Sequence, residues 1–491
     1  MRSLLRPRFA AILITVSFLS VPAQAAPWAE VGDNQLRTDI EMLAEAGALD
    51  GITTHWPLPW RSIGARLRDG LNGQPEMVRA AAERVLRRAR AETEPGFSAS
   101  LYLDATNAPS VVYGFDGMGR GEGTAQAVLD FNQGIFSGRL ALGGITQNGR
   151  GNTTKLNLDE SYLSARLGDV RLYGGWLSHW WGPGQVTALS LSNNARPMPQ
   201  IGISRAVTDA SSLPVLRWLG PWQVEFFVGV LDGQRIQTDG YFNALRFTFN
   251  PLPGLEIGLS RTEMFCGQGI SCVPLVDYFD LSNDPRNTNR VNDQGAFDIK
   301  YSGRMGQLPF QVYMQAMNED SSPFVHSGSS HLFGASIFVP ASTSPVKLTA
   351  EYADSVATED LFGFGTVMHG FAYNNGGFPD GMRYRGRTLG FSLDSDSRLW
   401  SLLGSWSDAD DRFYQLSLHH AEISTPLVSA VSPVFFNALT PVPVTINMAE
   451  ARVSLPWRGF RLDLAGRVQD DQLWPKRGFE AGLEAALRIN L

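Results

Sequence analysis

The residues best suited to chemistry lie in one stretch, 176–205, which reads WLSHWWGPGQVTALSLSNNARPMPQIGISR. Its amide and guanidinium groups offer many hydrogen bonds to hydroxyls, and an exposed indole packs against the C–H face of a sugar ring. The alternative is that these groups satisfy one another and nearby backbone where the chain narrows a channel. The residues that could contact a glycan or constrict a lumen are His179, Trp181, Asn193, Asn194, Arg196 and Arg205.

The histidines and serines of the chain do not form a recognisable catalytic pair. Ser178 and His179 are adjacent, and adjacent residues of a strand point to opposite faces, so they cannot act as nucleophile and base. His419 and His420 fail as a pair for the same reason, and Ser192 lacks the G-x-S-x-G setting of a hydrolase. We therefore expect no enzyme activity, cofactor or metal; a hydrolase completed in space by a distant histidine is the alternative.

The first 25 residues are typical of a secretory signal peptide. Three arginines precede an apolar run over 9–21, which is shorter than the roughly 20 residues of a membrane span. Ala23-Gln24-Ala25 supplies a small-x-small cleavage pattern, so we expect an exported protein cleaved near Ala25, with an uncleaved anchor as the alternative. No run of 18 apolar residues follows in the remaining sequence.

The two cysteines of the chain, Cys266 and Cys272, enclose a short loop. In an oxidising compartment such a pair predicts a disulfide. A metal site would need further ligands, and no histidine or acidic cluster stands beside the pair.

Residues 26–95 are predicted to form a small helical head. Apolar residues recur at helical spacing over 34–47 and 75–92, and residues 57–70 suggest a third short helix. Five arginines cover the other face of the 75–92 segment, where a solvated face is the simplest interpretation. Pro95-Gly96 ends the helical pattern.

From residue 96 to 491 the apolar period changes to two, which is typical of strands. In WQVEFFVGV, for example, Trp222 and Val224 alternate with Gln223 and Glu225. Tight turns such as LGDV, PLPG and PWRG join some strands, whereas long polar loops such as 266–292 join others. A soluble sheet of this size would normally divide into domains with linkers, and none is visible.

Short turns at one end and long loops at the other favour an outer-membrane barrel, because only a closed sheet satisfies its backbone in lipid. We therefore predict an all-β transmembrane barrel with a small N-terminal α-helical bundle. At about 22 residues for each strand and its connection, residues 96–491 supply about 18 antiparallel strands. Our strand count leaves one strand unplaced between 385 and 450, near PVPVTINM.

The barrel pleat divides the tryptophan cluster. Alternation continued past the tight turn at Gly168-Asp169 places Trp176 and Trp180 on the lipid face, in the aromatic girdle of the interface. It places His179 and Trp181 in the lumen. The strand is then ended, and the next segment interrupted, by residues that we assign a structural role: Gly182, Pro183, Gly184 and Pro197.

The stretch also resembles a known family. WWGPG followed by LSNNARPMPQIGISR, with LDESYLSARLGDVRLYGG just upstream, is similar to the signature of the Wzi family of capsule assembly proteins. The resemblance implies an 18-stranded barrel with a periplasmic helical bundle near its inner opening. It also implies a non-catalytic surface lectin that attaches capsular polysaccharide. The family-typical residues are Trp181, Gly182, Pro183, Gly184, Ser192, Asn193, Asn194, Ala195, Arg196 and Pro197.

The expected function is thus attachment or organisation of capsular polysaccharide or exopolysaccharide in the outer membrane of a Gram-negative bacterium. A porin or channel for polysaccharide or small solutes is the alternative. The expected partners are the polysaccharide, outer-membrane lipid and the polysaccharide export machinery. A net charge of -7 gives no basic patch for nucleic acid.

Overall fold

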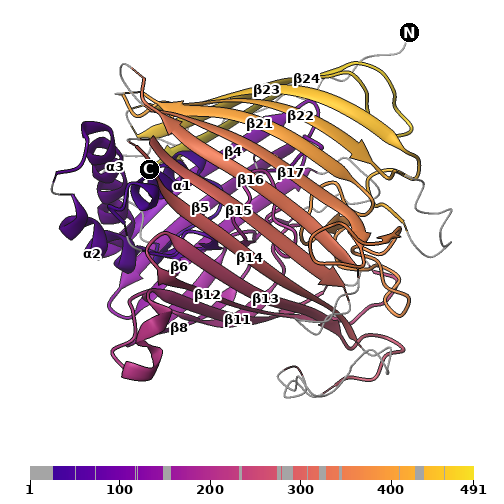
Figure 1. Ribbon diagram of the computed structural model, residues 1–491, viewed down its shortest axis with the longest axis horizontal. Helices are drawn as coiled ribbons and strands as arrows, with labels where there is room; N and C mark the ends of the chain where they lie inside the picture. Colours follow the sequence, from indigo (N-terminus) through magenta and orange to yellow (C-terminus); the bar gives the residue numbers. More distant parts are fainter. Residues whose placement is uncertain are drawn as a thin grey trace, which may run out of the picture.

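The computed structural model describes residues 26–49, 51–71, 73–116, 118, 120–146, 156–231, 235–273, 278, 291–306, 308–319, 328–341, 345–408, 410–425, 436–457 and 459–491. Eighteen antiparallel strands of this part of the chain close into a barrel (Figure 1). The predicted signal peptide, residues 1–25, lies outside the described residues, as do 274–277 and 279–290 of the predicted long loop.

The barrel confirms the predicted fold class and strand number. Its strands are β4 (Gly96–Thr106), β5 (Gly123–Gln133), β6 (Phe136–Thr146), β7 (Tyr162–Leu167), β8 (Val170–Gly175), β10 (Gln200–Arg205), β11 (Trp222–Val230), β12 (Tyr241–Leu252), β13 (Leu255–Phe265), β14 (Val291–Met305), β15 (Leu308–Glu319), β16 (Ser329–Val339), β17 (Val346–Thr358), β21 (Arg398–Ser407), β22 (Phe413–Ile423), β23 (Val444–Trp457), β24 (Phe460–Gln469) and β25 (Glu480–Asn490). The unplaced strand near PVPVTINM is β23. β25 pairs with β4, with Leu487 opposite Leu103, and this seam completes the ring.

The smaller elements are not strands of the ring, apart from β18, which extends it. They are β1 (Trp28–Ala29), β2 (His55–Trp56), β3 (Leu58–Pro59), β9 (Trp180–Trp181), β18 (Val367–Met368, beside β17), β19 (Arg383–Tyr384), β20 (Arg387–Thr388) and the 3-10 helix η1 (Pro214–Leu219).

The two ends of the barrel differ in their connections. At one end, two-residue turns join β5 to β6, β7 to β8, and β12 to β13. At the other end, β13 and β17 are followed by the long connections 266–290 and 359–397. We call these the short-turn end and the long-loop end. In outer-membrane barrels they face the periplasm and the exterior, respectively.

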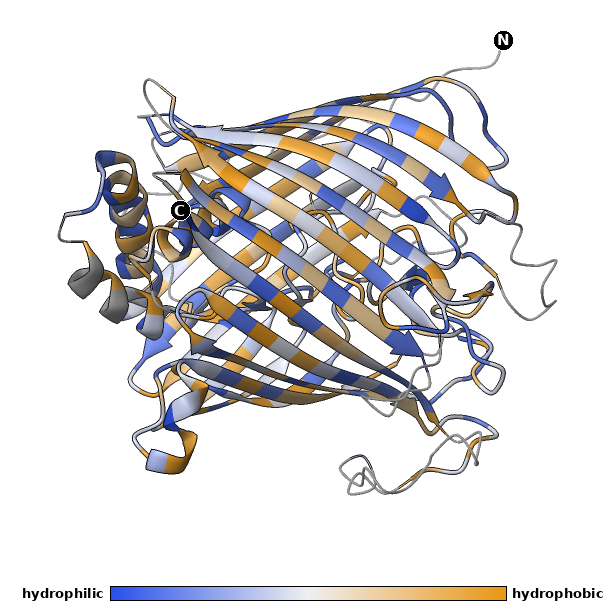
Figure 2. Ribbon diagram, viewed as in Figure 1, coloured by the Kyte–Doolittle hydropathy of each residue, from blue (hydrophilic) through white to orange (hydrophobic). Residues whose placement is uncertain are grey.

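The wall has a polar inner face and an apolar outer face, the reverse of a soluble protein. On β11, Gln223 and Glu225 point inward and are buried, whereas Trp222 and Val224 point outward. Outward Ile201 is 70% exposed and Leu418 is 57% exposed. Figure 2 shows this alternation as stripes along each strand. Such an outer surface is stable only in lipid, so the barrel is a membrane protein.

The helices α1 (Asn34–Glu45), α2 (Trp60–Gly70) and α3 (Glu76–Thr93) gather at the short-turn end (Figure 1). Their apolar faces pack together through buried Ile40, Leu43, Ala81 and Val85, the periodic residues of the sequence. Asp33 caps α1 by accepting the amide of Leu36 at 3.0 Å. Among the described residues, no helix is long and apolar enough to cross a membrane.

Candidate functional site in the barrel lumen

The chain between β8 and β10 does not continue the wall but folds into the lumen. β8 ends at Gly175, where a φ of 154° breaks the pleat. A Cβ at this position would lie 2.1 Å from the carbonyl oxygen of Ser161, so glycine is required. The chain then forms β9, which pairs antiparallel with β2 of the head region. We call residues 176–199 the lumen segment.

The prediction that Trp180 faces lipid is wrong. Its side chain is fully buried, packs edge-on against Phe115 at 5.4 Å between ring centroids, and donates from Nε1 to the carbonyl of Gly184 at 3.0 Å. The alternation rule fails here because the wall strand stops at Gly175. Trp176 follows directly and is half-buried, so its place in an aromatic girdle stays a prediction.

His179 and Trp181 both lie in the lumen, but neither offers a free ring face. The His179 imidazole stacks on Phe227 at 4.6 Å, and its Nδ1 lies 3.5 Å from the Glu225 carboxylate. Trp181 is completely buried and contacts His179 and Phe227 edge-on. Both side chains therefore fill the lumen, and a sugar ring has no surface of theirs on which to stack.

Arg196 is held by an ion pair. Its Nε and Nη2 donate to the Asp159 carboxylate at 2.8 and 2.7 Å, and Nη2 also donates to Asn157 at 3.0 Å. Arg196 is 4% exposed and Asp159 is 6% exposed. The guanidinium thus fastens the lumen segment to the approach to β7.

The two asparagines of the motif hold other segments. Asn193 donates to the carbonyl of Phe115 at 2.8 Å, and Asn194 donates to the carbonyl of Thr388 at 2.9 Å. The Asn194 carbonyl accepts from Arg387 at 3.3 Å. The motif could bind a sugar or constrict the lumen. Its contacts are those of a constriction that joins three distant parts of the chain.

The Gly-Pro-Gly turn lets the lumen segment approach both the wall and the head. A Cβ on Gly184 would lie 2.0 Å from the carbonyl oxygen of Thr187. Arg37 of α1 donates to the carbonyls of Pro183 and Gly184 at 3.1 and 2.7 Å. Pro197, farther along, is buried. The turn therefore ties the head to the contents of the barrel.

Arg205 does not belong to this cluster. It ends β10 opposite Val170, at the short-turn end, where its guanidinium lies 4.0 Å above the Trp222 ring. Its Nη1 donates to the carbonyl of Asp209 at 2.7 Å. The prediction that Arg205 acts with the motif is wrong, because β10 carries it to the opposite end from Gln200.

Sequence reasoning missed the wall carboxylates that hold the lumen segment. Glu351 of β17 accepts the backbone amides of Gln185, Val186 and Thr187 at 2.5, 3.0 and 3.1 Å, and the hydroxyl of Tyr313 at 2.8 Å. The sequence does place Glu351 at an inward-facing position of the strand alternation, and this was the signal that could have revealed its role. A buried carboxylate with four donors fixes the segment firmly.

A second wall carboxylate holds the residues just before the head strand β2. Glu256 of β13 accepts the amides of Thr53 and Thr54 at 3.0 and 2.8 Å, together with both hydroxyls. Beside it, Arg246 pairs with Asp298 and donates to the Thr54 carbonyl at 3.2 Å. Charges of the wall thus fix both inserted segments.

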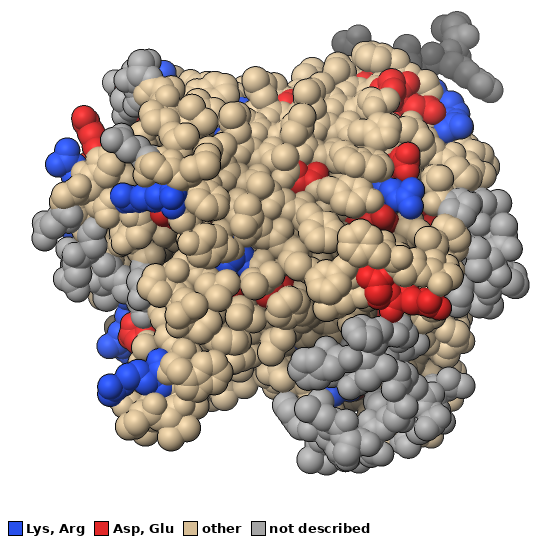
Figure 3. All heavy atoms as spheres, viewed as in Figure 1, with Lys and Arg blue, Asp and Glu red and all other residues tan. Residues whose placement is uncertain are grey.

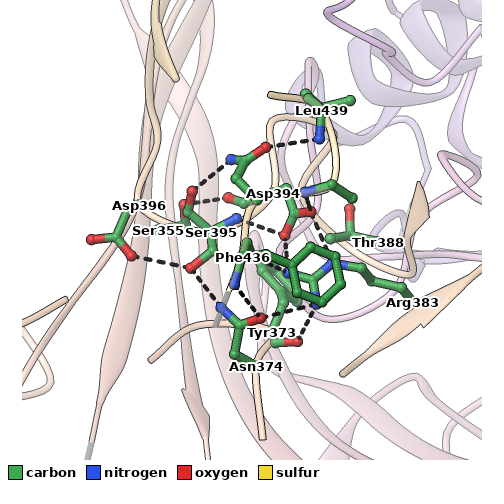
Figure 4. A network of polar contacts seen from close by, with 12 residues as sticks. Ser355, Tyr373, Asn374, Arg383, Thr388, Asp394, Ser395, Asp396, Phe436 and Leu439 are labelled. Carbon is green, nitrogen blue, oxygen red and sulfur yellow. Dashed lines mark hydrogen bonds and ion pairs between the residues drawn. The ribbon is translucent and has the colours of Figure 1, made fainter. Parts of the chain in front are cut away.

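Residues 369–397 of the connection after β17 also fold inward, and Figure 4 shows polar contacts of this part. Arg383 donates to both carboxylate oxygens of Asp394, at 2.6 and 2.8 Å. Asp396 accepts the amide of Gly370 and lies 2.6 Å from the His369 ring nitrogen. Burial raises the pKa of Asp396, although His369 opposes the shift. The connection is a packed polar structure rather than an open pocket.

Two further predictions concern the cysteine pair and metal binding. Cys266 and Cys272 are joined in a disulfide after β13. Within the described ranges, no group of three or more His, Cys, Asp or Glu residues is arranged to hold a metal.

The fold and its contents define a class: an outer-membrane β-barrel whose lumen is filled by its own chain. The family model described as capsule assembly protein Wzi matches residues 88–474, so the chain belongs to this family. The resemblance seen in the sequence is thereby confirmed.

Two similar proteins extend this comparison. An "uncharacterized 55.8 kDa protein in cps region" of Klebsiella pneumoniae is 27% identical over 340 residues, covering 67% of this chain and 66% of that protein. A solved structure of Wzi, described as an outer membrane protein involved in group 1 capsule assembly in Escherichia coli and a carbohydrate-binding β-barrel, has a TM-score of 0.80. It is 21% identical, with 94% of this chain and 98% of that chain covered.

Proposed function

We propose that this protein attaches or organises capsular polysaccharide or exopolysaccharide at the cell surface, without catalysis. The family membership and the carbohydrate-binding description of the solved Wzi structure support this proposal. The observation that carries it is the filled lumen. Glu351 and Glu256 bind backbone amides of the inserted segments, so among the described residues these segments occupy part of the barrel lumen.

The same observation argues against the porin alternative. A diffusion porin needs a continuous aqueous lumen, whereas here wall carboxylates hold residues 53–54 and 185–187 inside it. The motif residues His179, Trp181, Asn193, Asn194 and Arg196 are therefore proposed to keep the lumen constricted, rather than to contact sugar.

Sugar contacts are proposed instead on exposed loops of the long-loop end. Trp474, between β24 and β25, is 50% exposed and lies in a loop with Gln472 and Arg477. An accessible indole beside amide and guanidinium groups suits a glycan better than the buried motif does.

The periplasmic head is the proposed contact for the export machinery. Its exposed α3 face carries Arg79 and Arg90, whereas Arg87 on the same face pairs with Asp411 of the barrel at 2.7 Å. Glu76, Glu83 and Glu94 are exposed beside these arginines, so the surface is of mixed charge and would meet a partner that carries both signs.

Deletion of the gene tests the function. We expect polysaccharide to be released into the medium while total synthesis is unchanged; unchanged cell attachment would contradict the proposal. Trp474→Ala should reduce retention, whereas Trp457→Ala, at the short-turn end, is the matched control. In planar bilayers the wild-type protein should show no large steady conductance, and such a conductance would favour the porin.

A further inference from the structure

The outer face of the wall carries an ordered row of aromatic and polar side chains near the long-loop end. Tyr352, Trp400, His420 and Asn447 are direct neighbours across β17, β21, β22 and β23. The Tyr352 and Trp400 rings lie 5.1 Å apart, and the Trp400 and His420 rings lie 5.3 Å apart. Asn447 continues the row by donating to Asp470 at 2.6 Å. Trp400 is 39% exposed.

A second row of ionic groups lies next to it, toward the exterior. Asp354, Arg398 and Glu422 are cross-strand neighbours on β17, β21 and β22. Arg398 donates from Nε to Asp354 at 3.1 Å, and its Nη1 lies 3.5 Å from Glu422. The Tyr352 hydroxyl donates to Asp354 at 2.7 Å, which joins the two rows. We call these residues, with His420, Asn447 and Asp470, the outer band.

Toward the middle of the membrane the wall beside the outer band is apolar and hollow. A groove of about 1110 Å³ begins at Trp400 and His420. Its outward lining includes small Ala335, Ala350 and Ala449. Larger side chains flank it at Phe333, Leu402, Leu418 and Val468. In Figure 3, charged side chains gather over the long-loop ends of the strands on this face, and few appear between the two ends.

The groove and the outer band are complementary to different parts of one molecule. A groove floored by small apolar side chains and flanked by large ones can hold acyl chains. An acyl chain that packs into it fills space that would otherwise be a void between the wall and the lipid. An exposed indole flanked by amide, imidazole, guanidinium and carboxylate groups suits the C–H face and hydroxyls of a sugar. Three carboxylates against one arginine disfavour a headgroup whose recognition depends on phosphate alone.

We propose that this face binds an outer-leaflet glycolipid, with acyl chains in the groove and a headgroup sugar on Trp400. The site is separate from the proposed polysaccharide contact, because it faces the membrane rather than the loops above it. It would fix one glycolipid molecule against β17, β21, β22 and β23.

Native mass spectrometry of the detergent-purified full-length protein tests this proposal. The probes are rough-type lipopolysaccharide from which the phosphates have been removed and phosphatidylethanolamine, added separately. We expect one lipopolysaccharide molecule to bind and phosphatidylethanolamine to bind at least about tenfold more weakly. Trp400→Ala should weaken lipopolysaccharide binding about tenfold, or about 1.4 kcal/mol, because tryptophan is among the residues whose truncation most often weakens a contact.

The matched control is Trp406→Ala. Trp406 lies on the same strand and the same outward face, but six residues nearer the short-turn end, where it stacks on Tyr414 at 5.2 Å. The Trp406→Ala variant should bind lipopolysaccharide as the wild type does. Equal loss in both variants, or equal binding of both lipids by the wild type, would overturn the proposal. Dimers that persist after lipid removal would assign the groove to a second copy of the chain and also overturn it. Arg398→Ala, which leaves every ring in place, supplies a second variant with the same expected loss.

Discussion

Replacing Glu351 by glutamine should loosen the lumen segment without opening the wall. The carboxylate now accepts four donors, from the backbone of Gln185, Val186 and Thr187 and from Tyr313. A glutamine retains one acceptor oxygen and turns an NH₂ donor toward the remaining donors. We therefore expect the contacts of one carboxylate oxygen, two hydrogen bonds, to be lost.

The size of the effect follows from these two bonds. A hydrogen bond to a charged group contributes about 1.5–3 kcal/mol, so the lower value gives a loss of about 3 kcal/mol. At about 1.4 kcal/mol for each tenfold change, local opening should become more than about a hundredfold more frequent.

Hydrogen exchange measured by mass spectrometry in detergent micelles checks this expectation. Amides of 183–189 should lose protection in Glu351→Gln, whereas amides of β5 and β6 on the other side of the barrel should not. Glu422→Gln, on the outer face of the wall, is the control. Unchanged protection over 183–189, or an equal loss throughout the barrel, would refute the assigned role.

Three further perturbations test the packing of the head and lumen. Burial raises the pKa of Glu45 to about 8 from 4.5, so folding takes up a proton between these pH values. Stability of the head should then fall by up to about 1.4 kcal/mol per pH unit across that window, and Glu45→Gln should remove this fall in thermal melts at pH 5 and 8. Gly184→Ala should lower the melting temperature through a clash with Thr187, worth about 1–3 kcal/mol; an unchanged melting temperature would contradict the required close approach. Arg196→Ala should destabilise the protein by up to about 3 kcal/mol by leaving Asp159 buried without its bidentate partner, and adding Asp159→Asn should recover part of this in denaturant titrations; no recovery would assign the loss to packing alone.

The strands of the wall were predictable because the alternation within each strand is enough to identify it. Alternation in WQVEFFVGV already separates the buried Gln223 and Glu225 from the outward Trp222 and Val224. Helical spacing in the head worked for the same reason, since α3 buries one apolar face. In α1 the apolar face is buried too, but Arg37 and Glu41 are also buried, where they contact the lumen segment and the wall. Both patterns are local, and the membrane only decides which face of the strand points outward.

The lumen was not predictable by the same rules. Alternation assigned Trp180 to lipid because nothing in the adjacent residues reveals that Gly175 adopts a positive φ and turns the chain inward. The partners of Asn194 and Arg196 are Thr388 and Asp159, which are 194 and 37 residues away. Polar groups suited to a sugar were equally suited to one another, and only the folded chain decides between them.

The β25–β4 seam joins the first and the last strand of the ring. It brings Leu103 beside Leu487, among the most distant pairings along the chain, and such contacts are slow to form. A hydrogen-bonded ring has no side entrance, and the lumen segment is fixed to strands on several sides of it. The lumen segment and the closed wall therefore stabilise one another, because Glu351 of β17 holds the segment against a sheet that the seam keeps closed. A chain whose interior fails to pack should accordingly accumulate as an unclosed sheet with two free edges, exposed to aggregation before it reaches the membrane.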